Sequence, residues 1–290
     1  MSTDAKSDRL AAALESGDLE RRLDAIAEVT LADLTRDPQA HCSERALAAL
    51  IECLADSRKV VQRRAADALG SAAAHDPRIV PGLRAALDSG DPRRRWGAAY
   101  ALGLIDRALD LRARNALLEA LANPDGDVRW AAKDLLVRLA GDNPDEVRRS
   151  LIALEHSPDH DARKMALYCL RDLEFAGPEV RAMAARASRA AESGVRLAAL
   201  SLLVGLAEAS GAAHDDAQDD TQNVAIDIAL RCLESDPDPG VRRAAASALG
   251  HFGAAPRAAQ ALERAASQTA DPALAKTARH TLAGIAATKS

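Results

Sequence analysis

Apolar and small residues recur at positions 0, 3, 4, 7 and 8 of a ten-residue string that repeats along the chain. The clearest copy begins at Val241 and reads VRRAAASALG. Positions spaced by three and four residues lie on one face of an α-helix, so each string predicts an amphipathic helix with one buried face. Small side chains at positions 3, 4 and 7 would let neighbouring helices approach closely.

Six further copies of the string follow the same register. They begin at Val61, Arg94, Val128, Ala162, Val195 and Leu274, and with Val241 included the successive intervals are 33, 34, 34, 33, 46 and 33 residues. A fixed period in this range is typical of a helical repeat array. The long interval holds the string HDDAQDD, and we predict an acidic insertion between helices at residues 210–221, forming a solvated, flexible loop. A degenerate eighth copy lies near residues 19–28, and the sequence does not fix its register.

A second amphipathic segment precedes each string, for example at residues 79–87, 115–121, 147–154 and 224–233. Each repeat is therefore expected to be a first helix, a short turn rich in Asp and Pro, and a second helix. The composition agrees, because the chain is 48% hydrophobic but only 2% aromatic, and alanine, the strongest helix former, is the most frequent apolar residue. We predict an all-α fold of about eight helical pairs that forms a single solenoid over residues 1–290.

The strings DPDPGVRRAAASALG and DPRRRWGAAYALG resemble HEAT repeats of the short, phycobilin-lyase-like kind. The resemblance covers roughly residues 10–285. It implies a right-handed α-α superhelix in which first helices form the convex side and second helices line the concave side. It also implies that binding surfaces lie on the concave side. The scaffold hosts many roles, so the resemblance specifies a fold and not a function.

Acidic and basic residues form two columns beside the strings. In five strings an Asp stands three residues before the first residue; these are Asp91, Asp125, Asp159, Asp238 and Asp271, and Glu192 takes this place in a sixth string. In five strings an Arg directly follows the first residue; these are Arg95, Arg129, Arg163, Arg196 and Arg242. An Asp at this place can cap its helix by accepting backbone N–H bonds. The two columns together predict a structural ladder of charge-assisted hydrogen bonds along the stack.

Positions 2, 5 and 6 of the second helices are expected to face away from the packed side, into the groove. Both tryptophans and both tyrosines of the chain fall at positions 2 and 6 of three consecutive repeats. We predict a partner-binding surface made of Arg63, Asp67, Trp96, Tyr100, Trp130, Asp134, Lys164 and Tyr168, with the aromatic rings partly exposed in one contiguous concave patch. Aromatic side chains are enriched at binding hot spots. The competing interpretation is that these rings pack between repeats.

The charge of the chain bears on the kind of partner. A formal net charge of −5 disfavours a dedicated nucleic-acid binder, which usually has a basic face. Aromatic anchors among mixed charges suit a protein or peptide partner better. We therefore predict a non-catalytic binding scaffold or adaptor.

Cofactor and catalytic motifs are absent from the sequence. The four cysteines have no Cys-x-x-Cys spacing and the seven histidines are scattered, so no metal, cofactor or catalytic residue is predicted. The first nine residues carry charges and no apolar run, and no apolar stretch of 18 residues occurs, so we expect a cytoplasmic protein without a membrane span.

Two alternatives place an enzyme on the same scaffold. The repeat type and the aromatic groove are similar to those of phycobilin lyases, which would imply a bound tetrapyrrole. Asp134 near Trp130 resembles the arrangement in alkylpurine DNA glycosylases built on HEAT-like repeats. In that case the Asp would stabilise positive charge that develops on the sugar. The regular repeats and the acidic charge of this chain depart from the glycosylase pattern.

Overall fold

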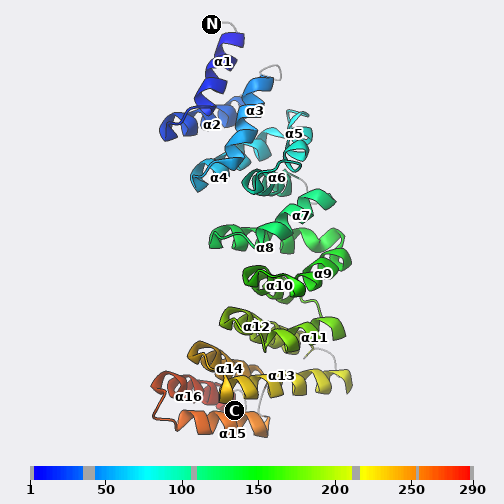
Figure 1. The fold of residues 1–290 in the computed structure, drawn as a ribbon, viewed down its shortest axis with the longest axis vertical. Helices are drawn as coiled ribbons and strands as arrows, with labels where there is room; N and C mark the ends of the chain where they lie inside the picture. The colour runs from blue at the N-terminus through cyan, green and yellow to red at the C-terminus, as the bar shows by residue number, and fades with distance from the viewer. Residues whose placement is uncertain (1–2, 35–42, 106–109, 211–215, 253–254, 288–290) are drawn as a thin grey trace. The chain divides into compact units, whose positions relative to one another are not determined.

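The computed structural model describes residues 3–34, 43–105, 110–210, 216–252 and 255–287. These residues form sixteen α-helices and three short 3-10 helices, and they contain no β-strand (Figure 1). The prediction of an all-α fold of about eight helical pairs is thereby confirmed. The chain divides into two compact units, Met1–Asp142 and Asn143–Ser290, which we call the N-terminal and the C-terminal unit.

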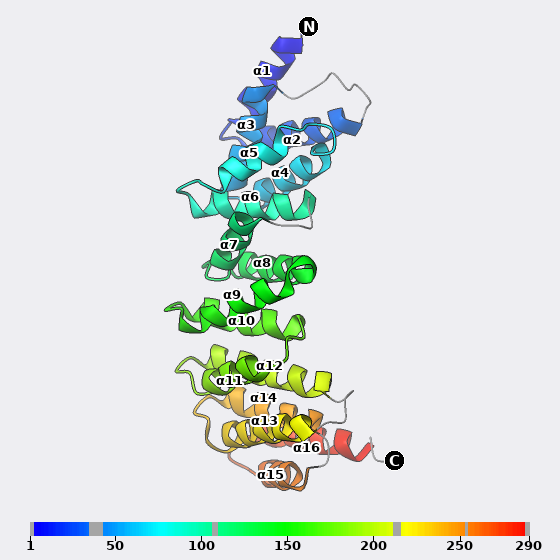
Figure 2. The same ribbon diagram turned by 90° about the vertical axis from the view of Figure 1, so that its right-hand side faces the viewer.

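The N-terminal unit contains four helical pairs. The helices are α1 (Thr3–Leu14), α2 (Leu19–Leu34), α3 (Glu44–Glu52), α4 (Lys59–Ala72), α5 (Ile79–Ala86), α6 (Pro92–Ile105), α7 (Leu111–Ala120) and α8 (Gly126–Leu139), with 3-10 helices η1 (Cys53–Ala55) and η2 (Ala140–Asp142). Odd-numbered helices are the first helices of their repeats and even-numbered helices are the second. First helices pack on first helices and second on second, as α1 does on α3 and α4 on α6 (Figure 2).

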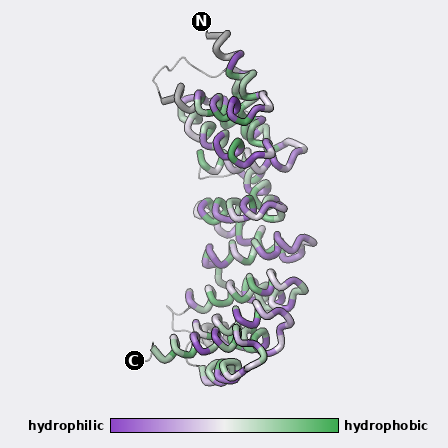
Figure 3. The backbone as a smooth tube through the Cα atoms, turned by 90° about the vertical axis from the view of Figure 1, so that its left-hand side faces the viewer, coloured by the Kyte–Doolittle hydropathy of each residue, from purple (hydrophilic) through white to green (hydrophobic). Residues whose placement is uncertain are grey.

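The C-terminal unit repeats the same order. Its helices are α9 (Pro144–Ala153), α10 (His160–Asp172), α11 (Pro178–Ala187), α12 (Ser193–Ser210), α13 (Asp216–Ser235), α14 (Pro239–His251), α15 (Pro256–Ala266) and α16 (Pro272–Ala287), with the 3-10 helix η3 (Leu154–His156) after α9. The second helices α10, α12, α14 and α16 pack on one another in succession. Hydrophilic and hydrophobic segments alternate along the helices, as the amphipathic strings predict (Figure 3).

The buried face of the second helices differs from the predicted face by a small rotation. In α14 the buried positions of the string are 0, 4, 5, 7 and 8, from Val241 to Leu249, and α4 buries the same positions. Position 3 was expected to be buried and position 5 exposed, yet Arg64 at position 3 is exposed and Ala66 at position 5 is buried. The reason is that a second helix packs against its own first helix and also against the second helices of neighbouring repeats.

The acidic insertion is mostly helical and not a loop. Residues 211–215 lie outside the described part of the chain, but α12 continues to Ser210 and α13 begins at Asp216. These helices have 18 and 20 residues, against 13 residues in α10 and in α14. The prediction of a loop over residues 210–221 is therefore wrong from Asp216 onward. Acidic residues favour the first turns of a helix because they face the positive end of its dipole.

The register of the degenerate first repeat follows from its capping bond. The Asp18 carboxylate accepts a hydrogen bond from the backbone N–H of Arg21 at 2.8 Å. Asp18 therefore occupies the place of the other capping aspartates, and the string of this repeat begins at Arg21. Arg22 then corresponds to the arginines that follow the first residue of the later strings.

No helix in the described part of the chain is long and apolar enough to span a membrane. Cys53, Cys169 and Cys232 are free and buried. Burial raises the pKa of the Cys53 thiol to about 11, so this side chain behaves as a small apolar group.

Candidate functional site: a groove on the second helices

The arginines of the predicted ladder close the turn of their own repeat. Each donates from its guanidinium to the backbone carbonyl six residues earlier, and Gln62 makes the same contact in the repeat that lacks Arg. The pairs are Gln62 to Asp56, Arg95 to Ser89, Arg129 to Asn123, Arg163 to Ser157, Arg196 to Ala190 and Arg242 to Asp236, at 2.6 to 3.0 Å. These side chains thus satisfy carbonyl groups that the turn leaves without partners.

Four of these arginines, together with Arg22 of the first repeat, also pair with an acidic residue of the following repeat. The pairs are Arg22 with Asp56, Arg95 with Glu119, Arg163 with Glu192, Arg196 with Asp236, and Arg242 with Asp271. Most of these acceptors differ from the predicted aspartate column. The physical reason is that Asp91, Asp125, Asp159 and Asp238 direct a carboxylate oxygen to backbone N–H groups at the start of their own helices.

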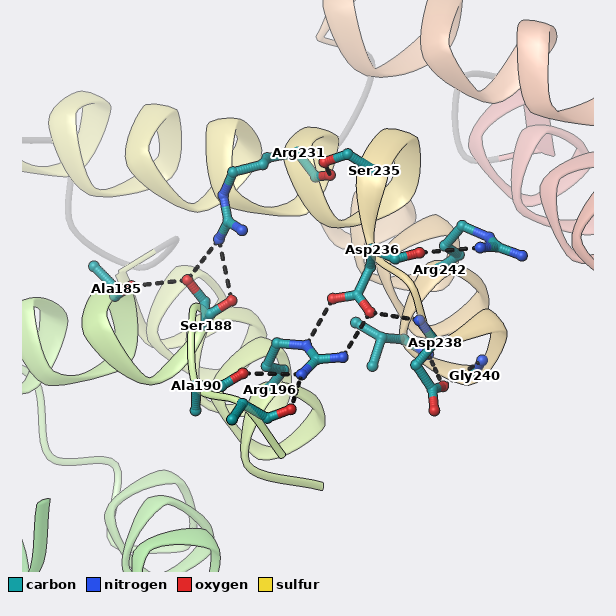
Figure 4. Close-up of polar contacts among 12 residues, drawn as sticks. Ala185, Ser188, Ala190, Arg196, Arg231, Ser235, Asp236, Asp238, Gly240 and Arg242 are labelled. Atoms are coloured by element: carbon teal, nitrogen blue, oxygen red, sulfur yellow. Dashed lines mark hydrogen bonds and ion pairs between the residues drawn. The ribbon is translucent and has the colours of Figure 1, made fainter. Parts of the chain in front are cut away.

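The most buried of these pairs joins Arg196 of α12 to Asp236, which precedes α14 (Figure 4). The side chains are 8% and 3% exposed, and two parallel hydrogen bonds of 2.8 Å connect them. Burial by itself would raise the pKa of Asp236, but hydrogen bonds from Arg196 and from the Asp238 N–H hold that pKa below its ordinary value. Arg196 also donates to the carbonyls of Ala190 and Ala191, so every part of this network is structural.

A groove opens between the second helices of the N-terminal unit. Its pocket has a volume of about 200 Å³. The N-terminal parts of three helices line it: Lys59, Gln62, Arg63 and Ala66 from α4, Trp96, Gly97 and Tyr100 from α6, and Asp127, Val128 and Ala131 from α8. It therefore lies on the second helices, where the sequence placed the candidate surface.

Two glycines of α6 explain why the groove exists. A Cβ atom at Gly97 would lie 2.7 Å from the carbonyl oxygen of Leu54, so α6 approaches η1 closely at its N-terminal end. A Cβ atom at Gly103 would lie 2.7 Å from the Leu135 side chain, so α6 touches α8 near its C-terminal end. The two helices run in different directions, since Figure 1 shows α8 lengthwise and Figure 2 shows α6 lengthwise. They diverge toward their N-terminal ends, and the pocket fills this space.

Trp96 forms the floor of the groove and is not an exposed ring. Its residue is 8% exposed, so the prediction of a partly exposed indole is wrong here. The indole also borders a second hollow beside the turn between α7 and α8, lined by Pro92, Ala116 and Pro124. The ring is buried because it fills the gap between α6 and this turn. The Tyr100 ring lies against it, with ring centroids 5.3 Å apart, and is half-buried.

Lys59 crosses one end of the groove. Its ammonium group lies 2.9 Å from Asp125 Oδ1 and 2.7 Å from Asp127 Oδ2, so it joins the start of α4 to the start of α8. The two carboxylates raise the pKa of Lys59, and Lys59 in turn lowers that of Asp125. The two carboxylates at this end therefore share one ammonium group, and the three side chains together keep a net charge of −1.

Trp130 and Asp134 are exposed on α8. Trp130 is 46% exposed, in agreement with the expected partly exposed ring, and the Lys133 ammonium lies 5.4 Å from its ring centroid. Asp134 forms an ion pair with Lys133 at 2.8 Å. Neither Trp130 nor Asp134 lines the pocket between α4, α6 and α8.

The other residues of the predicted surface fall in both units. Arg63 and Asp67 are exposed on α4. Lys164 and Tyr168 lie on α10 in the C-terminal unit, where Lys164 pairs with Asp161. The Arg171 guanidinium lies 5.2 Å from the Tyr168 ring, and burial raises the pKa of Tyr168. Whether these residues continue one patch across both units stays a prediction.

The C-terminal unit has a polar pocket that the sequence analysis missed. It measures about 580 Å³ and is lined by residues of α10, α12 and α14 and by Glu174, the second residue after α10; Arg171, Ser201, Glu208 and His251 are among the others. Arg171 donates to Ser201 Oγ at 2.7 Å, and His251 Nδ1 lies 2.7 Å from Glu208 Oε1. Apart from Ser201, which is at position 6 of its string, these residues stand at the ends of the strings or beyond them, where the repeat pattern carries no signal. Among the described residues, no group of three or more His, Cys, Asp or Glu side chains is placed to hold a metal ion.

Comparison with solved structures shows the same kind of fold. Kap121p, in the triple mutant D353K/E396K/D438K, matches with a TM-score of 0.70 and 13% identity over 99% of this chain and 34% of that one. Importin beta matches with a TM-score of 0.57 and 16% identity over 97% of this chain and 39% of that one. The chain thus spans between a third and two fifths of the length of these two proteins.

A smaller protein also matches. The archaeal HEAT-like repeats protein from Thermococcus onnurineus NA1 has a TM-score of 0.50 and 17% identity over 84% of this chain and 98% of that one. No curated protein matches the sequence. The family of HEAT repeats matches residues 47–136 and 217–283, which is more than half of the chain. The chain therefore belongs to the HEAT-repeat family.

Proposed function

We propose that the protein is a non-catalytic binding scaffold that holds a segment of a protein partner in the groove between α4, α6 and α8. The pocket with the Trp96 and Tyr100 rings carries this proposal. The chain contains very few aromatic residues, and a pocket lined by two of them suits the anchor side chain of a peptide. The exposed Trp130 on α8 offers a second apolar contact beside the groove.

The size of the pocket favours a side chain over a pigment. At about 200 Å³ it is smaller than the roughly 300–1,000 Å³ of pockets that enclose drug-sized ligands, and a tetrapyrrole is larger still. The glycosylase alternative receives no support from Asp134, since this carboxylate is exposed and paired with Lys133. Among similar solved structures, one is of Kap121p bound to RanGTP, so a solenoid of this kind holds a protein partner there.

A peptide-display selection against the full chain tests the proposal. Selected peptides are expected to lose affinity by about 30-fold when Tyr100 or Trp130 is replaced by Ala, which corresponds to a hot-spot cost of about 2 kcal/mol. Fluorescence anisotropy of labelled peptides gives the affinities, and circular dichroism verifies that the helices remain.

Leu111→Ala is the matched control, because Leu111 is an exposed apolar residue of the same unit on a first helix. It should leave peptide affinity unchanged. Peptides that bind the Tyr100→Ala and Trp130→Ala variants as well as the unaltered chain would contradict the proposal.

A further inference from the structure

The second helices that form the groove are basic, although the chain as a whole has a formal net charge of −5. Helices α4, α6 and α8 together carry nine Lys or Arg residues and three Asp residues. The acidic residues of the chain therefore lie mainly elsewhere. A local excess of one sign attracts groups of the opposite sign even on a protein whose total charge disagrees.

Most of these basic side chains are already occupied. Arg94 pairs with Glu52, Arg95 pairs with Glu119, and Lys59 pairs with Asp125 and Asp127. Four arginines of these helices have no ion pair with the described residues and are exposed: Arg63, Arg64, Arg93 and Arg138. Among them Arg63 lines the pocket itself.

The acidic residues beside the pocket are already engaged in ion pairs. Asp125 and Asp127 share the Lys59 ammonium group, and Asp134 is paired with Lys133. A cationic ligand entering the pocket would have to compete with Lys59 and would face Arg63. An anionic group would meet Arg63 without displacing any pair, so the charges of the groove complement an acidic partner.

We infer that the partner segment carries a carboxylate next to an apolar or aromatic side chain. The apolar side chain enters the pocket above Trp96 and beside Tyr100, and the carboxylate pairs with Arg63 at the rim. An Arg guanidinium suits this role because it binds a carboxylate through two parallel hydrogen bonds. This inference rests on the proposed function and specifies the chemistry of the partner.

The test uses a random peptide library displayed against the full chain, followed by selection against Arg63→Glu. Peptides selected by the unaltered chain are expected to be enriched in Asp or Glu adjacent to an apolar residue. Arg63→Glu should weaken these peptides at least about tenfold, and selection against it should enrich Lys or Arg instead. Affinity should also fall as salt rises, because the pair lies at the rim.

Lys276→Glu is the matched control, since Lys276 occupies the same position of its string and is exposed on α16. It should leave the affinity of the peptides unchanged. Peptides that depend on Tyr100 but show no acidic enrichment would overturn the inference and leave the proposed function standing. Failure to select any peptide would overturn both.

The last part of the test measures the binding of a single-stranded oligonucleotide of twenty thymidines to the full chain. Arg63 would serve a phosphate as well as a carboxylate, so this probe separates the two sources of negative charge. The expected result is binding far weaker than that of the acidic peptides. Binding that is tighter than that of the peptides and is lost in Arg63→Glu would assign the groove to nucleic acid and overturn the inference.

Discussion

The groove of the N-terminal unit and the Arg196–Asp236 network of the C-terminal unit use the same repeat in opposite ways. In the groove, α6 and α8 diverge, and Arg63 and the Tyr100 ring are left accessible. In the network, α12 and α14 pack together, and a charged pair is buried with every hydrogen bond made inside the protein. The comparison teaches that position 1 of the string, which Arg196 occupies, stabilises the fold, whereas position 2, which Arg63 occupies, stays accessible to a partner.

The largest expected effect comes from replacing each of the two tryptophans, one at a time, with alanine. Trp96→Ala should lower the free energy of unfolding by about 4 kcal/mol, since it empties a buried site. Trp130→Ala should lower it by less than about 1 kcal/mol, because its ring is 46% exposed. Urea denaturation followed by circular dichroism measures both. Equal losses would contradict the assignment of Trp96 to the buried floor of the groove and of Trp130 to its exposed surroundings.

Removing one member of the buried ion pair should have the next largest effect. Arg196→Ala leaves Asp236 buried without its main donor, and we expect a loss of about 3 kcal/mol in the free energy of unfolding. Arg264→Ala is the control in the same unit, because Arg264 and its partner Glu234 are both exposed. This exposed pair should contribute less than about 1 kcal/mol. A similar loss in both variants would show that the network is no more than a surface pair.

The turn contact of the arginine column should be worth less than the buried pair. Arg129→Ala removes the donor to the carbonyls of Asn123 and Pro124, and we expect a loss of about 1–3 kcal/mol. Arg148→Ala, on first helix α9, should change stability by less than about 0.5 kcal/mol. Thermal and urea unfolding measure both variants. Equal losses would contradict the structural role assigned to Arg129 in its turn.

The smallest effect concerns pH. Since the pKa of Asp236 is lowered in the folded state, its contribution to stability is fully present above its unfolded pKa of about 3.9 and is lost as the pH falls through the lower, folded value. Urea midpoints measured from pH 7 to pH 3 should therefore fall below about pH 5. In Asp236→Asn the urea midpoint should fall less steeply below about pH 5, because the titrating carboxylate is gone. If the midpoint of that variant falls as steeply as that of the unaltered chain, Asp236 is not the source of the pH dependence.

The period, the helix pairs and the capping aspartates could be predicted from the sequence because they depend on local spacing. The partners of Arg95 and Arg196 could not, because the length of the next first helix and turn decides which acidic residue comes within reach. The burial of Trp96 was missed for a related reason. Its environment depends on where α6 and α8 diverge, and contacts of Gly97 and Gly103 with Leu54 and Leu135 decide that. Spacing within one string contains no information on such contacts.

The arginine that follows the first residue of most strings gives the array a direction. Within each unit, the guanidinium donor belongs to one repeat and the acceptor belongs to the next, as with Arg163 and Glu192 or Arg242 and Asp271. Repeats joined in this way behave like head-to-tail monomers, so a duplicated repeat fits only in one orientation. In the copy that begins at Leu274 the donor position is Ala275. A repeat engineered to follow α16 would therefore need Ala275→Arg before it could join by the same bond.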